Sequence, residues 1–134
     1  MSTNETMKYF DLHTQGLGYL NRIRDVTPKE GAPFLSVTLA ALRGRVDNVQ
    51  YTHFECRVSG KQAQDIVSRL KPAVEDSANV LIGFTLSDLY AEAFTFKNGD
   101  KAGETGVSLK ARLLRIAWAK VDGQPFYTAE EHAA

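Results

Sequence analysis

The stretch FLSVTLAALRGRVDNVQYTHFECRVSGK, residues 34–61, alternates apolar and polar side chains through two runs. Because side chains on a β-strand point alternately to opposite faces, this period of two predicts two half-buried strands. Asp47 and Asn48, between the runs, suit a hairpin connection. The side chains expected to face the core are Leu35, Val37, Leu39 and Ala41 in the first run, and Phe54, Cys56 and Val58 in the second.

The second run also has an outward row that does not suit a hydrophobic interior. It consists of Tyr51, His53, Glu55 and Arg57. Such a row is either a binding surface or a set of ordinary solvent-exposed side chains that keep the protein soluble.

Length and composition predict one compact domain in the cytoplasm. The chain has 134 residues, 43% of them hydrophobic and 24% charged, which is ordinary for a globular protein. A single cysteine excludes an internal disulfide framework, and no apolar run approaches the roughly 20 residues that span a bilayer. The opening residues do not form a secretory signal. Sixteen basic and sixteen acidic side chains cancel, which counts against a histone-like binder but permits a local basic stripe.

The rest of the chain supplies the other expected elements. Residues 14–26 form a first strand in which Gly16 and Gly18 allow a bulge or strong coiling. Residues 61–76 repeat apolar side chains at spacings of three and four, which predicts an amphipathic helix that Pro72 ends or bends. Its apolar stripe is Ala63, Ile66, Val67, Leu70 and Val74.

Two strands follow the helix. Val80, Ile82, Phe84 and Leu86 share one face of the first, and Val107, Leu109, Ala111 and Leu113 one face of the second. Residues 97–106 form the hairpin tip between them, and residues 122–134 form a flexible tail without periodicity. The resulting domain division is an N-terminal segment over 1–13, a barrel over 14–121 and the tail.

The order of three strands, a helix and two strands indicates an all-β protein with one helix. A five-stranded Greek-key barrel with a helix between strands three and four is the OB-fold, whose open face and loops commonly bind oligonucleotides. We expect Ile66, Val67 and Leu70 to close one end of the barrel.

Four segments of the chain follow one another in an order that is informative about its family: GLGYLNRIRDV (16–26), PFLSVTLA (33–40), VSGK (58–61) and NVLIGFTL (79–86). Their order and spacing resemble the bacterial single-stranded-DNA-binding proteins, in which the third strand ends in F-G-K ahead of the helix. The whole chain looks more like a branch of replication proteins carried on integrative conjugative elements. The resemblance covers residues 14–121. It implies a single-stranded-DNA partner and a homo-oligomer, either a dimer or a tetramer. Because the strands of such a barrel leave edges that proteins cover or pair, we expect the interface at strand one and the segment around residues 9–20.

The resemblance also implies where bases stack. Counting back from Gly60 and Lys61, the strand-three tryptophan of the family falls at His53, and Tyr51 lies two residues earlier on the same face. The other stacking positions of the family lie near the fourth strand and its hairpin. There this chain offers Tyr90, Phe94 and Phe96.

Single strands are held by aromatic platforms beside a basic track for the phosphates. Arg57, Lys110 and Arg112 are the best-placed candidates for that track, because the period of two puts them on outward faces. Further candidates are Arg22, Arg24, Arg43, Lys97 and Lys101. Lys and Arg are common on the solvent-exposed faces of strands, and this explains any one of these cations equally well.

An enzymatic reading finds little support in the sequence. Cys56 and His53 are three residues apart and therefore on opposite faces of the expected strand. The histidines are scattered without metal-ligand spacing, no phosphate-binding loop is present, and no cofactor is expected. Two functions remain: a non-enzymatic single-stranded-DNA binder, or an OB-fold interaction module that docks a replication partner through Tyr51, Phe94 and Phe96.

Overall fold

The structure is a computed structural model, which describes residues 9–129. It contains one six-stranded sheet and the helix α2, Lys61–Glu75. The strands are β1 (His13–Val26), β2 (Phe34–Arg45), β3 (Asn48–Val58), β4 (Val80–Thr95), β5 (Thr105–Val121) and β6 (Gln124–Thr128).

The first five strands close into a barrel. β1 pairs antiparallel with both β2 and β4, β2 pairs with β3, and β4 pairs with β5. A parallel pairing of β3 with β5 completes the ring. With α2 between β3 and β4, this architecture is the OB-fold, as the order of elements predicts.

The core lies inside the barrel and is capped by α2. Val37, Leu39, Phe54 and Cys56 are buried, which confirms the expected inward faces of β2 and β3. The apolar stripe of α2 faces the core, as predicted. Its buried residues are Ala63, Ile66, Val67 and Leu70, and Val74 is partly buried against the core. The sequence therefore specifies the barrel through two periods, two along the strands and three to four along α2.

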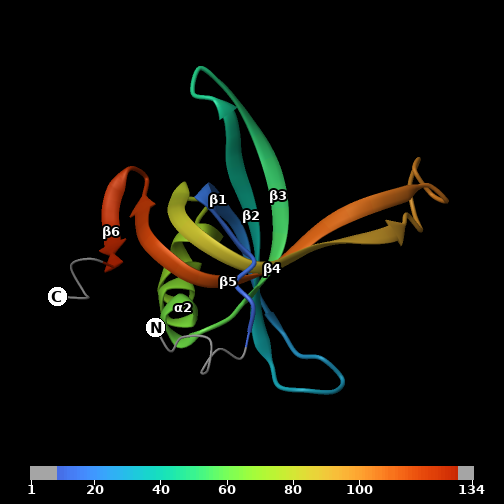
Figure 1. Ribbon diagram of the computed structural model, residues 1–134, viewed down its shortest axis with the longest axis horizontal. Helices are drawn as coiled ribbons and strands as arrows, with labels where there is room; N and C mark the ends of the chain where they lie inside the picture. Colours follow the sequence, from blue (N-terminus) through green and yellow to red (C-terminus); the bar gives the residue numbers. More distant parts are fainter. Residues whose placement is uncertain (1–8, 130–134) are drawn as a thin grey trace.

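The β2–β3 and β4–β5 hairpins extend well beyond the body of the barrel. Figure 1 shows the β2–β3 hairpin and the β4–β5 hairpin projecting from it in different directions. Val107 lies on the second hairpin and is 64% exposed. It shares the face of Leu109 and Leu113 as predicted, but it is not buried, because β5 carries it out along the projecting hairpin, where it pairs with the exposed Ala93.

Pro72 does not end α2. The helix continues through it to Glu75, and the N–H of Asp76 donates to the Pro72 carbonyl oxygen at 3.0 Å. Proline removes one helical donor, but Ala73 and Val74 pack against the core and hold the final turn in place.

The expectation of a loose tail over 122–134 is wrong for residues 124–128, which form β6 along β5. Tyr127 is buried there, and its hydroxyl accepts a hydrogen bond from Gln62 Nε2 at 2.8 Å. The same amide nitrogen donates to the Ile116 carbonyl oxygen at 2.8 Å. Residues 130–134, and the N-terminal residues 1–8, lie outside the described part.

β1 contains a bulge that changes which residues face outward. Leu20 pairs with Leu39 and Arg22 pairs with Thr38, so Asn21 is the extra residue. Gly18 is the glycine that this region requires, because a Cβ there would lie 2.8 Å from the Ala40 carbonyl oxygen. The close approach of β1 to β2 therefore depends on glycine at this position.

Candidate nucleic-acid interface

The outer face of the barrel is organised in rows of side chains from neighbouring strands. Ala40 of β2 pairs with Tyr19 of β1 on one side and with His53 of β3 on the other. The next row contains Arg22, Thr38, Glu55, Lys110 and Tyr90, and the row after it contains Arg24, Ser36, Arg57 and Arg112. Residues far apart in the sequence thus share one surface.

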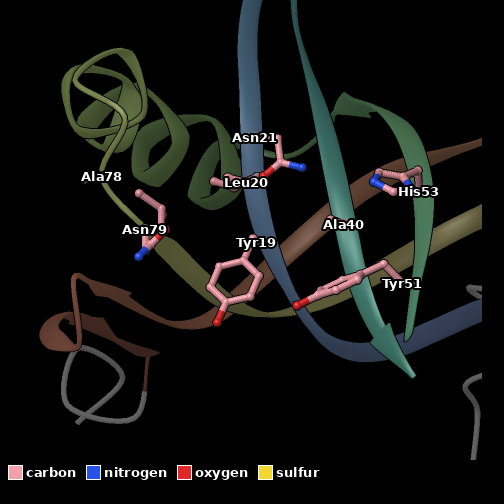
Figure 2. Close-up of a pocket in the computed structure, with 9 residues that line it drawn as sticks. Tyr19, Leu20, Asn21, Ala40, Tyr51, His53, Ala78 and Asn79 are labelled. Carbon is pink, nitrogen blue, oxygen red and sulfur yellow. The ribbon is translucent and has the colours of Figure 1, made fainter. Parts of the chain in front are cut away.

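The first row opens into a cleft of about 470 Å³, which we call the aromatic cleft. Its lining residues include Tyr19, Asn21, Ala40, Tyr51, His53 and Asn79. Figure 2 shows Tyr51 reaching from β3 across β2 toward Tyr19, with His53 further along β3. Tyr51 is 47% exposed, so its ring is accessible to a ligand.

The lower rows form a second depression of about 460 Å³, the basic groove. Its charged lining residues are Arg24, Arg57, Lys110 and Arg112, with Glu55 and Asp88 as the acids. Phe34 and Tyr90 also line it. Four cations against two carboxylates leave an excess of two positive charges, so this face is locally basic although the chain as a whole is neutral.

Several groove side chains are already held in place. The Arg57 guanidinium lies over the Phe34 ring, 4.2 Å from its centroid. Lys110 and Arg112 approach Glu92 and Asp88 respectively, each at 3.6 Å. These exposed ion pairs are weak, and a phosphate can compete with them. Among the groove cations, Arg57 thus contacts an aromatic ring, whereas Lys110 and Arg112 contact carboxylates.

Glu55 is the acidic group at the centre of this face. Its two carboxylate oxygens accept hydrogen bonds from the Thr38 hydroxyl at 3.1 and 3.0 Å. Thr38 therefore turns the carboxylate toward β2.

The β4–β5 hairpin carries the remaining predicted site residues. Phe94 and Phe96 meet edge to face with centroids 4.9 Å apart, and Lys101 Nζ lies 5.6 Å from the Phe96 centroid. Lys97 is exposed near the tip. Phe94 lies on the same face of β4 as Tyr90, four residues further out, so it extends the groove face without lining either depression.

Sequence reasoning missed Tyr19, Asn21 and Phe34. The outward position of Tyr19 and Asn21 depends on the bulge in β1, for which the available signal is the spacing of three between the buried Leu20 and Ile23. Phe34 belongs to the outward set of its run, but only the register of β2 with β3 places it beneath Arg57.

Cys56 lies in the core and not in a reactive site. It is 1% exposed, and burial raises the pKa of its thiol to about 12, with a smaller contribution from the Glu55 carboxylate. The thiolate is the nucleophilic form of cysteine, so a thiol with this pKa is unreactive near neutral pH. In residues 9–129, no group of three or more His, Cys, Asp or Glu side chains is placed to hold a metal ion.

We expect Cys56 in the folded protein to resist alkylation. Iodoacetamide at pH 8 should modify the thiol at least ten times more slowly than in urea-unfolded protein, measured by intact mass against time. Equal rates in the two states would contradict the burial of Cys56.

The helix of the described residues is not long and apolar enough to cross a membrane.

A family model described as "Protein of unknown function (DUF3577)" matches residues 3–134. The chain belongs to the DUF3577 family. A search of curated proteins finds no match to this DUF3577 chain. Among solved structures it is similar to the Plasmodium falciparum SSB complex with ssDNA, at 13% identity and a TM-score of 0.38, over 86% of this chain and 95% of that one.

Proposed function

We propose that this protein binds single-stranded DNA and catalyses no reaction. The observation that supports this most strongly is the adjacency of the aromatic cleft and the basic groove on one face of an OB barrel. His53 in the cleft and Arg57 in the groove lie four residues apart on the outer face of β3. Unpaired bases stack on aromatic rings while neighbouring cations contact the phosphates, and this face supplies both.

The finer role that we propose is replication or transfer of a mobile genetic element, in the cytoplasm. Its support is the order of the segments 16–26, 33–40, 58–61 and 79–86, which resembles the replication proteins of integrative conjugative elements. The site residues that we propose are Tyr51, His53, Arg57, Tyr90, Phe94, Phe96, Lys97, Lys101, Lys110 and Arg112.

Arg57→Ala tests the groove. Binding to single strands releases condensed counterions, so affinity falls as salt rises, by about 0.7 in the log–log slope for each phosphate contact. Arg57→Ala should reduce that slope by about 0.7 to 1, measured by fluorescence anisotropy of a labelled oligonucleotide at several salt concentrations. Arg69→Ala, on α2, is the matched control and should leave the slope unchanged. An unchanged slope in Arg57→Ala would remove Arg57 from the interface.

A second candidate function is docking of a replication partner protein. The exposed apolar side chains of the β4–β5 hairpin favour it, since Phe94 is 41% and Val107 64% exposed. Binding of this kind depends on apolar contact, so it would persist at high salt, whereas DNA binding through the groove would weaken steeply.

We also propose that the protein forms a dimer or tetramer through residues 9–20. Within the described residues, the start of β1 pairs only with β4, because pairing with β2 begins at Gly18. Unpaired strand edges favour association, and Leu12 and Leu17 near this edge are 61% and 44% exposed.

Light scattering at micromolar concentration should therefore report a mass of at least two chains. Leu17→Glu should shift the protein toward one chain, because a carboxylate at a paired interface is costly to bury. A monomer mass for the parent protein would contradict the proposal.

A further inference from the structure

The basic groove is lined by a serine whose hydroxyl has no partner in the protein. Ser36 is 9% exposed, and the alternation of β2 puts its side chain on the outer face, where it lines the groove. In residues 9–129 its hydroxyl forms no hydrogen bond, unlike that of Thr38, the next outward residue, which donates to Glu55. Every side-chain oxygen or nitrogen that is sealed from solvent in this part of the chain has a partner, so the unpartnered Ser36 oxygen is still accessible from the groove.

Two arginines flank this serine. Ser36 pairs with Arg24 of β1 on one side and with Arg57 of β3 on the other, and all three residues line the groove. Adjacent strands lie about 4.8 Å apart, so a short side chain stands between two long ones. The Arg57 guanidinium lies over Phe34, the preceding outward residue of β2, which holds it on the side of β3 that faces the serine. Both arginine side chains are exposed and free to close on a ligand above the hydroxyl.

The acidic residues of the groove are engaged with other groups. Asp88 lies 3.6 Å from Arg112, and Glu55 is held by the hydrogen bonds from its threonine neighbour. Among the described residues, no carboxylate forms an ion pair with Arg24 or Arg57. The two cations beside the serine are therefore uncompensated. A hydroxyl donor between two guanidinium groups is a combination that suits a phosphate, whose oxygens accept hydrogen bonds and carry negative charge.

We propose that Ser36, Arg24 and Arg57 form an anchor for one phosphate group, which an internal phosphodiester of the bound strand occupies. The serine hydroxyl donates to a phosphate oxygen, and the guanidinium groups contact the phosphate from both sides. The inference rests on the proposed DNA binding and adds to it one position at which a phosphate is held by a neutral hydrogen-bond donor as well as by charge. Phosphate contacts of this kind set the position of a strand on a protein.

Ser36→Ala tests the anchor without removing a charge. It should weaken binding of a labelled single strand roughly tenfold, the effect of losing one hydrogen bond to a charged group. The slope of affinity against salt should stay that of the parent, because no cation is lost. Arg24→Ala should lower both the affinity and the slope, the slope by about 0.7. Ser68→Ala makes the same change as Ser36→Ala at an exposed position of α2 and should bind like the parent.

Stability separates ligand binding from a structural role of the serine. Because its hydroxyl has no partner in the protein, Ser36→Ala should leave the midpoint of urea unfolding unchanged or raise it. A lower midpoint would show that the hydroxyl bonds within the protein and would overturn the anchor. Parent-like DNA affinity in the folded variant would overturn it as well.

Inorganic phosphate gives a test that does not depend on DNA. Added to the isotope-labelled parent protein, it should shift the amide NMR signals of Arg24, Ser36 and Arg57 more than sodium chloride of equal ionic strength does, and the excess should be smaller in Ser36→Ala. DNA binding without these shifts would overturn the anchor alone, whereas the shifts without DNA binding would overturn the proposed function and leave an anion site. A strand with a phosphate at its end should bind no more tightly than one without, and tighter binding would overturn the internal phosphodiester as the occupant.

Discussion

Replacing Leu39 by alanine should lower the free energy of unfolding by about 2 to 5 kcal/mol. Leu39 has no exposed surface, and in the sheet it pairs with Leu20 of β1 and with Phe54 of β3. Truncation removes three buried carbon atoms and leaves a cavity that strands held on both sides cannot collapse to fill. Urea unfolding followed by circular dichroism measures the change.

Val46→Ala is the control for this change. Val46 lies in the β2–β3 turn and is 96% exposed, so its truncation should alter stability by no more than about 0.5 kcal/mol. If Leu39→Ala behaved like Val46→Ala, Leu39 would not be in the core and the outward row of β2 would be assigned wrongly.

Replacing Tyr51 by alanine should weaken single-stranded-DNA binding by about 1 to 3 kcal/mol, or roughly 5- to 150-fold. Tyr51 is 47% exposed in the aromatic cleft, so its ring is available for stacking. Folding should change little, because the inward residues of β3 are untouched. Fluorescence anisotropy with a labelled single strand gives the affinity, and circular dichroism confirms the fold.

Phe126→Ala is the control for this change, because it truncates an aromatic side chain outside the proposed DNA-binding face. Phe126 lies on β6 and lines neither the aromatic cleft nor the basic groove. It should bind DNA like the parent. If folded Tyr51→Ala also bound like the parent, the aromatic cleft would not be the DNA site, and docking of a partner protein would become the better account.

The barrel is predictable from the sequence because its signals are local. Alternation in residues 34–58 gives two strands and their inward faces, and the spacing of Ala63, Ile66 and Leu70 gives the helix. Val107 shows the limit of this reasoning. Val107 lies on the predicted face of its strand. The alternating pattern, however, does not show where a strand leaves the barrel, because that depends on how far the neighbouring strands extend.

β6 was missed for a related reason. Its short run has no clear period, and it is held by pairing with β5 and by the Gln62 amide, which bridges Ile116 and Tyr127. Such contacts between distant residues leave no mark in the local pattern. Pro72 is the opposite case. A proline is a strong local signal for the end of a helix, but here the packing of Ala73 and Val74 against the core keeps the following turn helical.

The site was predictable in part. Periodicity alone assigns the outward row of β3, and four other candidates named from the sequence line the groove with Arg57: Tyr90, Lys110, Arg112 and Arg24. The ion pairs of Lys110 and Arg112 were not predictable, because they depend on the register of β4 with β5. Tyr19 and Asn21 required the bulge, which only the pairing of β1 with β2 defines.

The central claim is that the outer face carrying the aromatic cleft and the basic groove binds single-stranded DNA. The most direct measurement is a titration of the parent protein with a labelled single strand and with a duplex containing the same sequence, at low and at moderate salt. Unpaired bases are free to stack in the cleft, whereas paired bases are not, so the single strand should bind more tightly, with affinity that falls as salt rises. Absence of single-strand binding at low salt, or equal binding of the duplex, would contradict the claim.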